Sequence, residues 1–166
     1  MKIINKGDMP FYIKWALIAA IVYCIPMFFF LRTTEFKEVW LLYLGSAFFM
    51  VVIASSLLSL NGRYGGNSTT RTLITSGHVI TVMAIVVAFI ITLILTFFMV
   101  PEIYQKGAGE IVHGKPDSLD SITFIVAVGV VVINFAAGSI PSIILPQTMK
   151  QNQTTERGEN VSKPLI

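Results

Sequence analysis

The sequence predicts an all-α membrane protein with four transmembrane helices in an antiparallel up-down bundle, and with both termini on the same side. Hydrophobic residues make up 54% of the 166-residue chain and charged residues only 13%, against about 25% charge in soluble domains. The mean hydropathy is +0.75. Four apolar runs carry no charge away from their ends, and each is long enough to cross a hydrocarbon core of about 30 Å.

These runs divide the chain into one membrane domain and a tail. The domain covers residues 1–149, since the length allows a single domain. The tail at 150–166 is polar and lacks aromatic residues, so we expect it to be disordered. The predicted helices are 12–31, 39–60, 78–100 and 121–145.

The first two helices carry local signals. Asp8 followed by Pro10 is typical of a helix start. The run 12–31 is too long for the apolar part of a secretory signal, and no small-residue cleavage site follows it, so we expect a retained helix kinked at Pro26. Three serines of the second helix are expected to bond to carbonyls of their own helix: Ser55, Ser56 and Ser59.

A loop rich in Gly, Ser and Thr at 61–77 precedes the third helix. It has no GxxxxGK[ST] pattern and no preceding strand, so a phosphate-binding loop is not favoured. Ser68 or Thr69 can instead cap a helix that starts before the membrane. Within the third helix, small and weakly polar residues recur every four positions, which suits close packing against another helix: Ala84, Ala88, Thr92 and Thr96.

The loop 101–120 holds four acids, two lysines and His113. Such groups could build a metal or proton site, but their spacing follows no ligand pattern, and the glycines and prolines indicate an exposed, turn-rich segment. Asp120 is placed to cap the fourth helix. Pro146 is expected to end that helix.

Lysine and arginine are unevenly divided between the two sides of the predicted bundle. Eight lie on the side of the termini and of the loop 61–77, and four lie on the other side. Acidic residues are divided the other way, with three on the side of the termini and six on the opposite side. The positive-inside rule therefore predicts cytoplasmic N and C termini in the plasma membrane. Three Asn-x-Ser/Thr triplets, which begin at Asn67, Asn152 and Asn160, fall on the same side, and glycosylation of any of them would overturn this topology.

Asn134 is the only strongly polar side chain well inside a predicted span. Counting residues at 1.5 Å each places it near the depth of Tyr23 and Ala88, with Thr92 about one turn farther out. We expect the Asn134 amide to bond to Tyr23 or Thr92, with its own helix backbone as the alternative partner. The predicted polar packing seam consists of Asn134, Gly138, Ser142, Ala88, Thr92 and Tyr23.

The sequence lacks the residues that several kinds of functional site require. Ionisable groups inside a bilayer usually mark transport or proton pathways, and the spans have none away from their ends. The single cysteine, Cys24, excludes a paired-cysteine redox site. His78 has no second ligand at helical spacing, and no HExxH, GxSxG or paired-acid motif occurs. We therefore expect no catalytic site, no cofactor, no metal and no nucleic-acid partner.

The stretch Arg63-Tyr-Gly-Gly66, the threonine-rich segment after it and Gly77 at the opening of the third helix resemble a family of small four-span bacterial membrane proteins of unknown function, common in Bacteroidota. The resemblance covers about the middle third of the chain and the order of the spans. It implies an origin in a bacterial inner membrane. It implies no activity, because the family assigns none to its residues.

Three functions follow from this sequence as hypotheses. The first is a non-enzymatic membrane protein that associates with itself or with other membrane proteins through the small-residue faces of its third and fourth helices. The second is a small transporter or channel subunit that forms a pore by oligomerisation, lined by Thr81, Thr92, Thr96 and Asn134. The third is an enzyme that uses the loop 101–120 with His113.

Overall fold

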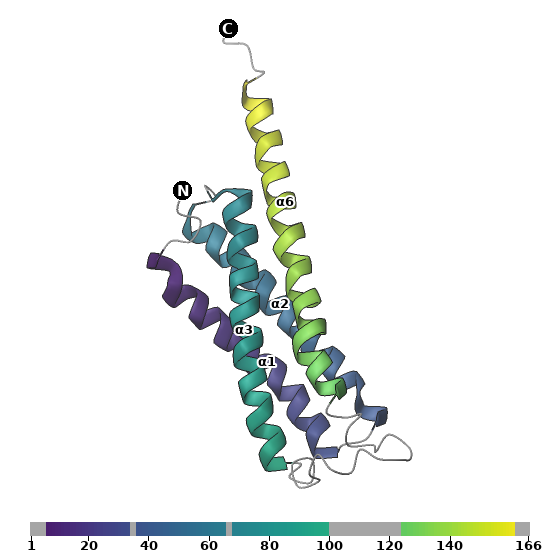
Figure 1. Cartoon of the computed structure of the whole chain (residues 1–166). Helices are drawn as coiled ribbons and strands as arrows, with labels where there is room; N and C mark the ends of the chain where they lie inside the picture. Colours follow the sequence, from purple (N-terminus) through teal and green to yellow (C-terminus); the bar gives the residue numbers. More distant parts are fainter. Residues whose placement is uncertain (1–5, 34–35, 66–67, 100–123, 162–166) are drawn as a thin grey trace.

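The computed structural model describes residues 6–33, 36–65, 68–99 and 124–161, and within these ranges the chain forms helices and no strand (Figure 1). Four helices are long and apolar enough to cross a membrane, at Met9–Thr33, Trp40–Arg63, Thr70–Met99 and Phe124–Met149. The predicted all-α class with four spans is therefore confirmed. The long helices are α1 (Met9–Thr33), α2 (Trp40–Arg63), α3 (Thr70–Met99) and α6 (Asn134–Val161).

Three shorter elements accompany them. The 3-10 turns η1 (Lys6–Asp8) and η2 (Phe36–Glu38) precede α1 and α2. The fourth span is interrupted by η3, a π-helical turn at Gly129–Ile133 that leads directly into α6. In this wide turn the N–H of Asn134 donates to the carbonyl of Gly129, five residues back. The apolar run 121–145 predicts an unbroken α-helix here, so the π turn is a feature that only the structure shows.

Contacts near the helix ends fix the direction of the chain. Asp8 at the start of α1 pairs with Arg63 at the end of α2, and Tyr12 of α1 bonds to Ser76 near the start of α3. The start of α1 and the end of α6 consequently lie at the same end of the bundle (Figure 1). The predicted antiparallel up-down arrangement with both termini on one side is confirmed.

The helices do not follow one another round the bundle in chain order. Helix α1 packs against α2 and α3, and α6 packs against the same two helices, whereas α2 and α3 share fewer contacts. The order round the bundle is therefore α1, α2, α6, α3. Helices α2 and α3 therefore lie on a diagonal of the bundle. In the turn after α2, Gly65 adopts φ 57°, a conformation that glycine adopts without steric cost.

The third helix begins earlier than its apolar run, at Thr70. The hydroxyl of Thr69 accepts a hydrogen bond of 3.2 Å from the N–H of Thr72, which is the geometry of an N-cap. The capping expected of Ser68 or Thr69 is thus found at Thr69. In α2, the hydroxyls of Ser55 and Ser56 donate hydrogen bonds to the backbone carbonyls of Val51 and Ile53, respectively, as expected of serines in an apolar helix.

The close approach of α3 and α6 depends on two glycines, each facing a hydroxyl side chain of the other helix. A Cβ added at Gly77 would lie 2.8 Å from the Cβ of Ser142, and one added at Gly138 would lie 3.0 Å from the Cβ of Thr81. On each helix the glycine and the hydroxyl residue are four positions apart, so the two contacts lie one helical turn from each other. We call these four residues, Gly77, Thr81, Gly138 and Ser142, the α3–α6 crossing.

The expected end of the fourth helix at Pro146 is wrong, because α6 continues through Pro141 and Pro146 to Val161. Proline removes one backbone hydrogen bond, and Pro146 therefore leaves the Ser142 carbonyl, four residues back, without its usual donor. Membrane spans tolerate a proline of this kind inside a helix. Where disorder was expected from residue 150 onward, the helix continues to Val161, since a helix that is already nucleated extends at low cost.

Replacing Gly138 with Ala should destabilise the bundle. The added Cβ would lie 2.4 Å from the Thr81 Cγ2 atom, and overpacking of this kind costs about 1–3 kcal/mol. The matched control is Gly62→Ala, because nothing lies within 4 Å of a Cβ at that exposed position. Unfolding in detergent micelles measures both variants, and equal stability of the two would contradict the close crossing.

Candidate functional site

The structure buries all six residues of the predicted polar seam. Tyr23, Ala88, Asn134 and Ser142 are fully buried and Thr92 is 4% exposed, while Gly138 is buried at the α3–α6 crossing. Ser142 donates a 2.6 Å hydrogen bond to the Gly138 carbonyl, so these two residues do form one unit. The six residues do not form one hydrogen-bonded chain.

No hydrogen bond of acceptable geometry joins the Asn134 amide to Tyr23 or Thr92, although the Tyr23 hydroxyl lies next to the amide. The Thr92 hydroxyl donates to the Ala88 carbonyl at 2.7 Å and lies 3.1 Å from the Met27 sulfur. A threonine in a helix can satisfy its own hydroxyl in this way, which removes it as a partner. Both polar atoms of Asn134 and the Tyr23 hydroxyl lack a hydrogen-bond partner among the described residues, so the alternative bond to the helix backbone is absent as well.

The four residues that would line an oligomeric pore also point into the bundle of a single chain. Thr81 and Asn134 are fully buried, and Thr92 and Thr96 are nearly so. The outer surface of α3 consists instead of large apolar side chains such as Val86, Phe89 and Phe97. This burial counts against a pore that several copies would line with these threonines.

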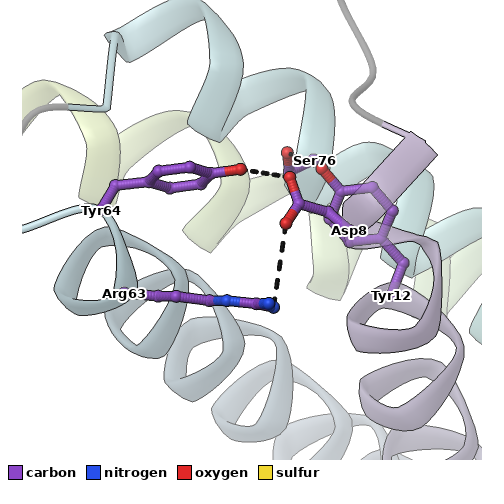
Figure 2. A network of polar contacts seen from close by, with 5 residues as sticks. All are labelled: Asp8, Tyr12, Arg63, Tyr64 and Ser76. Carbon is purple, nitrogen blue, oxygen red and sulfur yellow. Dashed lines mark hydrogen bonds and ion pairs between the residues drawn. The ribbon is translucent and has the colours of Figure 1, made fainter.

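A separate polar cluster joins three helices at the end of the bundle where α1 starts (Figure 2). Its centre is the carboxylate of Asp8, which is buried. The Tyr64 hydroxyl donates to Asp8 Oδ2, and Arg63 Nη1 lies 3.8 Å from Asp8 Oδ1. The first turn of α1 is thereby tied to the end of α2.

The same cluster extends to α3 through Tyr12. Its hydroxyl lies 2.9 Å from the Ser76 hydroxyl, within the buried interior. The Arg63 guanidinium also lies 5.8 Å from the centre of the Phe11 ring, within the range of a cation–π contact. We call these residues, Asp8, Tyr12, Arg63, Tyr64 and Ser76, the end cluster.

The end cluster holds helices together through hydrogen bonds and an ion pair. Arg63 is half exposed, and such ion pairs contribute little to stability. The stronger element is the hydroxyl of Tyr64 bonded to a buried carboxylate, because hydrogen bonds to charged groups are the strong ones. The cluster brings together no nucleophile and general base, and it fixes α1, α2 and α3 at one end of the bundle.

The sequence does not predict this cluster, since Asp8 reads there only as part of a helix start and Arg63 only as part of the Arg63-Tyr-Gly-Gly66 stretch. The sequence nevertheless contains a signal for this pairing. The chain crosses the membrane twice between the start of α1 and the end of α2, so Asp8 and Arg63 lie on the same side and are candidates for an ion pair.

The other candidate sites offer less evidence of a function. His78 Nδ1 lies 2.9 Å from the Ile74 carbonyl of its own helix. In the ranges that the structure describes, no three His, Cys, Asp or Glu side chains gather to hold a metal ion. The loop 101–120 with His113 lies outside the described residues. An apolar groove of about 340 Å³ on α1 and α3 has Cys24 in its wall but is otherwise lined by Ile and Phe.

The comparisons with known proteins bring no relative. No protein-family model matches the chain, and neither the curated proteins nor the solved structures contain a match. The resemblance to the four-span bacterial family stays a prediction.

Replacing Tyr64 with Phe should loosen the end cluster. The variant removes the hydroxyl that donates to the buried Asp8 carboxylate, and the loss of a hydrogen bond to a charged group costs about 1.5–3 kcal/mol. Tyr43→Phe is the matched control, because Tyr43 is exposed on α2, the helix that Tyr64 follows. If both variants unfold at the same denaturant concentration as the parent chain, the cluster does not clamp the helices.

Proposed function

We propose that this chain is a non-enzymatic integral membrane protein that acts by binding other membrane proteins or further copies of itself. The observation that carries the proposal is the length of α6. The apolar run of the fourth span ends at Leu145, yet the helix continues to Val161. In Figure 1 this part of α6 rises past the ends of the neighbouring helices.

The composition of the projecting part fits a docking element. Residues 150–161 are almost entirely polar, so their sequence contains no apolar stripe of the kind that packs against a bundle. This helical segment is an extension of the span, which nucleates it. A partner that packs along it at the membrane surface would stabilise it, which is the behaviour expected of a binding segment.

The partner surface proposed here differs from the one that the sequence suggested. The small residues of α3 and α6 were the first reason to expect association, but they are used within the chain, at the α3–α6 crossing. Binding by other proteins therefore falls to the projecting part of α6 and to the lipid-facing apolar surface. That surface includes exposed aromatic residues such as Phe97 and Phe98 of α3.

We further propose a bacterial inner membrane and a cytoplasmic location for the start of α1 and the end of α6. Support comes from cationic side chains exposed near that end of the bundle, namely Lys14, Arg63 and Arg71, together with the uneven count of lysine and arginine. A C-terminal fluorescent-protein fusion should be bright and an alkaline-phosphatase fusion inactive. The opposite pattern would reverse the orientation.

Truncation of the projecting helix tests the binding function. The full chain, a chain ending at Met149 and a control chain ending at Val161 are expressed with the same N-terminal tag and cross-linked in native membranes. The full and control chains should recover the same partner or second copy. The chain ending at Met149 should recover about tenfold less, the equivalent of about 1.4 kcal/mol of binding free energy.

The truncated chain must first show the same unfolding transition as the full chain, which separates lost binding from lost folding. Equal recovery by all three chains would exclude the projecting helix as the docking element. Activity or flux that survives in a purified monomer would argue against the binding function itself.

A further inference from the structure

The polar side chain of Asn134 follows directly after the π turn η3. Its side chain is fully buried. Its backbone N–H is bonded to the Gly129 carbonyl, but the amide nitrogen and the amide oxygen of the side chain both lack a partner among the described residues. Because a π turn takes up more residues than an α turn, it sets where this amide points.

A second unpaired group faces the Asn134 amide from α1. The side chain of Tyr23 is fully buried and packs between two glycines. The Tyr23 carbonyl lies 3.0 Å from a Cβ added at Gly45, and its hydroxyl lies 3.4 Å from one added at Gly129. The hydroxyl lies next to the Asn134 side chain, yet no hydrogen bond of acceptable geometry joins them.

A third unpaired group lies on α3, against the next turn of α6. The Thr81 Oγ1 atom is buried without a partner and lies 2.5 Å from a Cβ added at Gly138. Gly138 follows Asn134 by four residues, about one helical turn. Three helices thus contribute unpaired polar atoms to one region in the interior of the spans.

Such atoms are costly in a membrane. No bulk water reaches the hydrocarbon core, and an unsatisfied polar group there costs several kcal/mol. The Asn134 amide has two donors and an acceptor oxygen, so a direct bond to the single Tyr23 hydroxyl would still leave part of it unpaired. A ligand that both donates and accepts, and that is small enough for a packed bundle, satisfies these groups together.

We propose that Asn134 and Tyr23 form an internal binding site for water in the middle of the bundle, with Thr81 at its edge. Water is the smallest molecule that donates and accepts hydrogen bonds. Buried waters in proteins typically make about three hydrogen bonds to groups that are otherwise unsatisfied. No charged side chain faces the site from the described parts of α1, α2, α3 or α6, so the site suits a neutral ligand.

Water-edited solid-state NMR in lipid bilayers tests the site. The chain is labelled with ¹⁵N in asparagine and valine, and magnetisation is transferred from water protons to nitrogen. The side-chain nitrogen of Asn134 should build up signal several times faster than the backbone nitrogen of Val132, which faces lipid two residues away. Asn61, near the end of α2, provides the reference for a group close to bulk water.

Assignment does not require a change at the site. Of the five other asparagines, Asn61 lies in the last turn of α2 and four lie outside the spans. Asn61→Ser identifies the reference signal, which leaves Asn134 as the one signal from well inside a span. Tyr23→Phe should slow the transfer to Asn134, since it removes one of the groups that hold the water. A build-up at Asn134 as slow as at Val132 would overturn the proposal and favour a dry bond between Tyr23 and Asn134.

Discussion

The arrangement of this bundle depends on the approach of α3 to α6 at two glycines. In lipid, apolar surface gives little drive for helices to associate, so close van der Waals packing has to hold them together. At the α3–α6 crossing each glycine leaves room for a hydroxyl side chain of the opposite helix. The small residues of α3 face inward as a result, and the large apolar side chains face lipid.

The two other notable features lie on either side of this crossing. Toward the end where α1 starts, the end cluster fastens α1 to α2 and α3 through a buried carboxylate and two tyrosines. In the other direction, the π turn presents Asn134 to Tyr23. One end of the bundle therefore has its polar groups paired, whereas the interior keeps polar groups that protein atoms do not satisfy.

The sequence predicts what depends on hydropathy and local spacing. The four spans, the inward stripe of Ala84, Ala88, Thr92 and Thr96, and the cap at Thr69 all follow from patterns that a single helix displays. Features that depend on neighbouring helices do not follow. The path of α6 through Pro146, the unpaired amide of Asn134 and the pairing of Asp8 with Tyr64 depend on which helices meet, and the order α1, α2, α6, α3 has no signature along the chain.

The most direct test asks whether the small residues join helices within one chain or between chains. In a Cys24→Ser background, the pair Thr81→Cys and Gly138→Cys should form an intramolecular disulfide, because their Cβ atoms lie close together, at 3.0 Å, and need less than about 1 Å of movement to reach disulfide geometry. Val82→Cys with Gly138→Cys should not form one, since Val82 faces lipid. The account predicts a cross-linked monomer, and a disulfide-linked dimer from the first pair would contradict it.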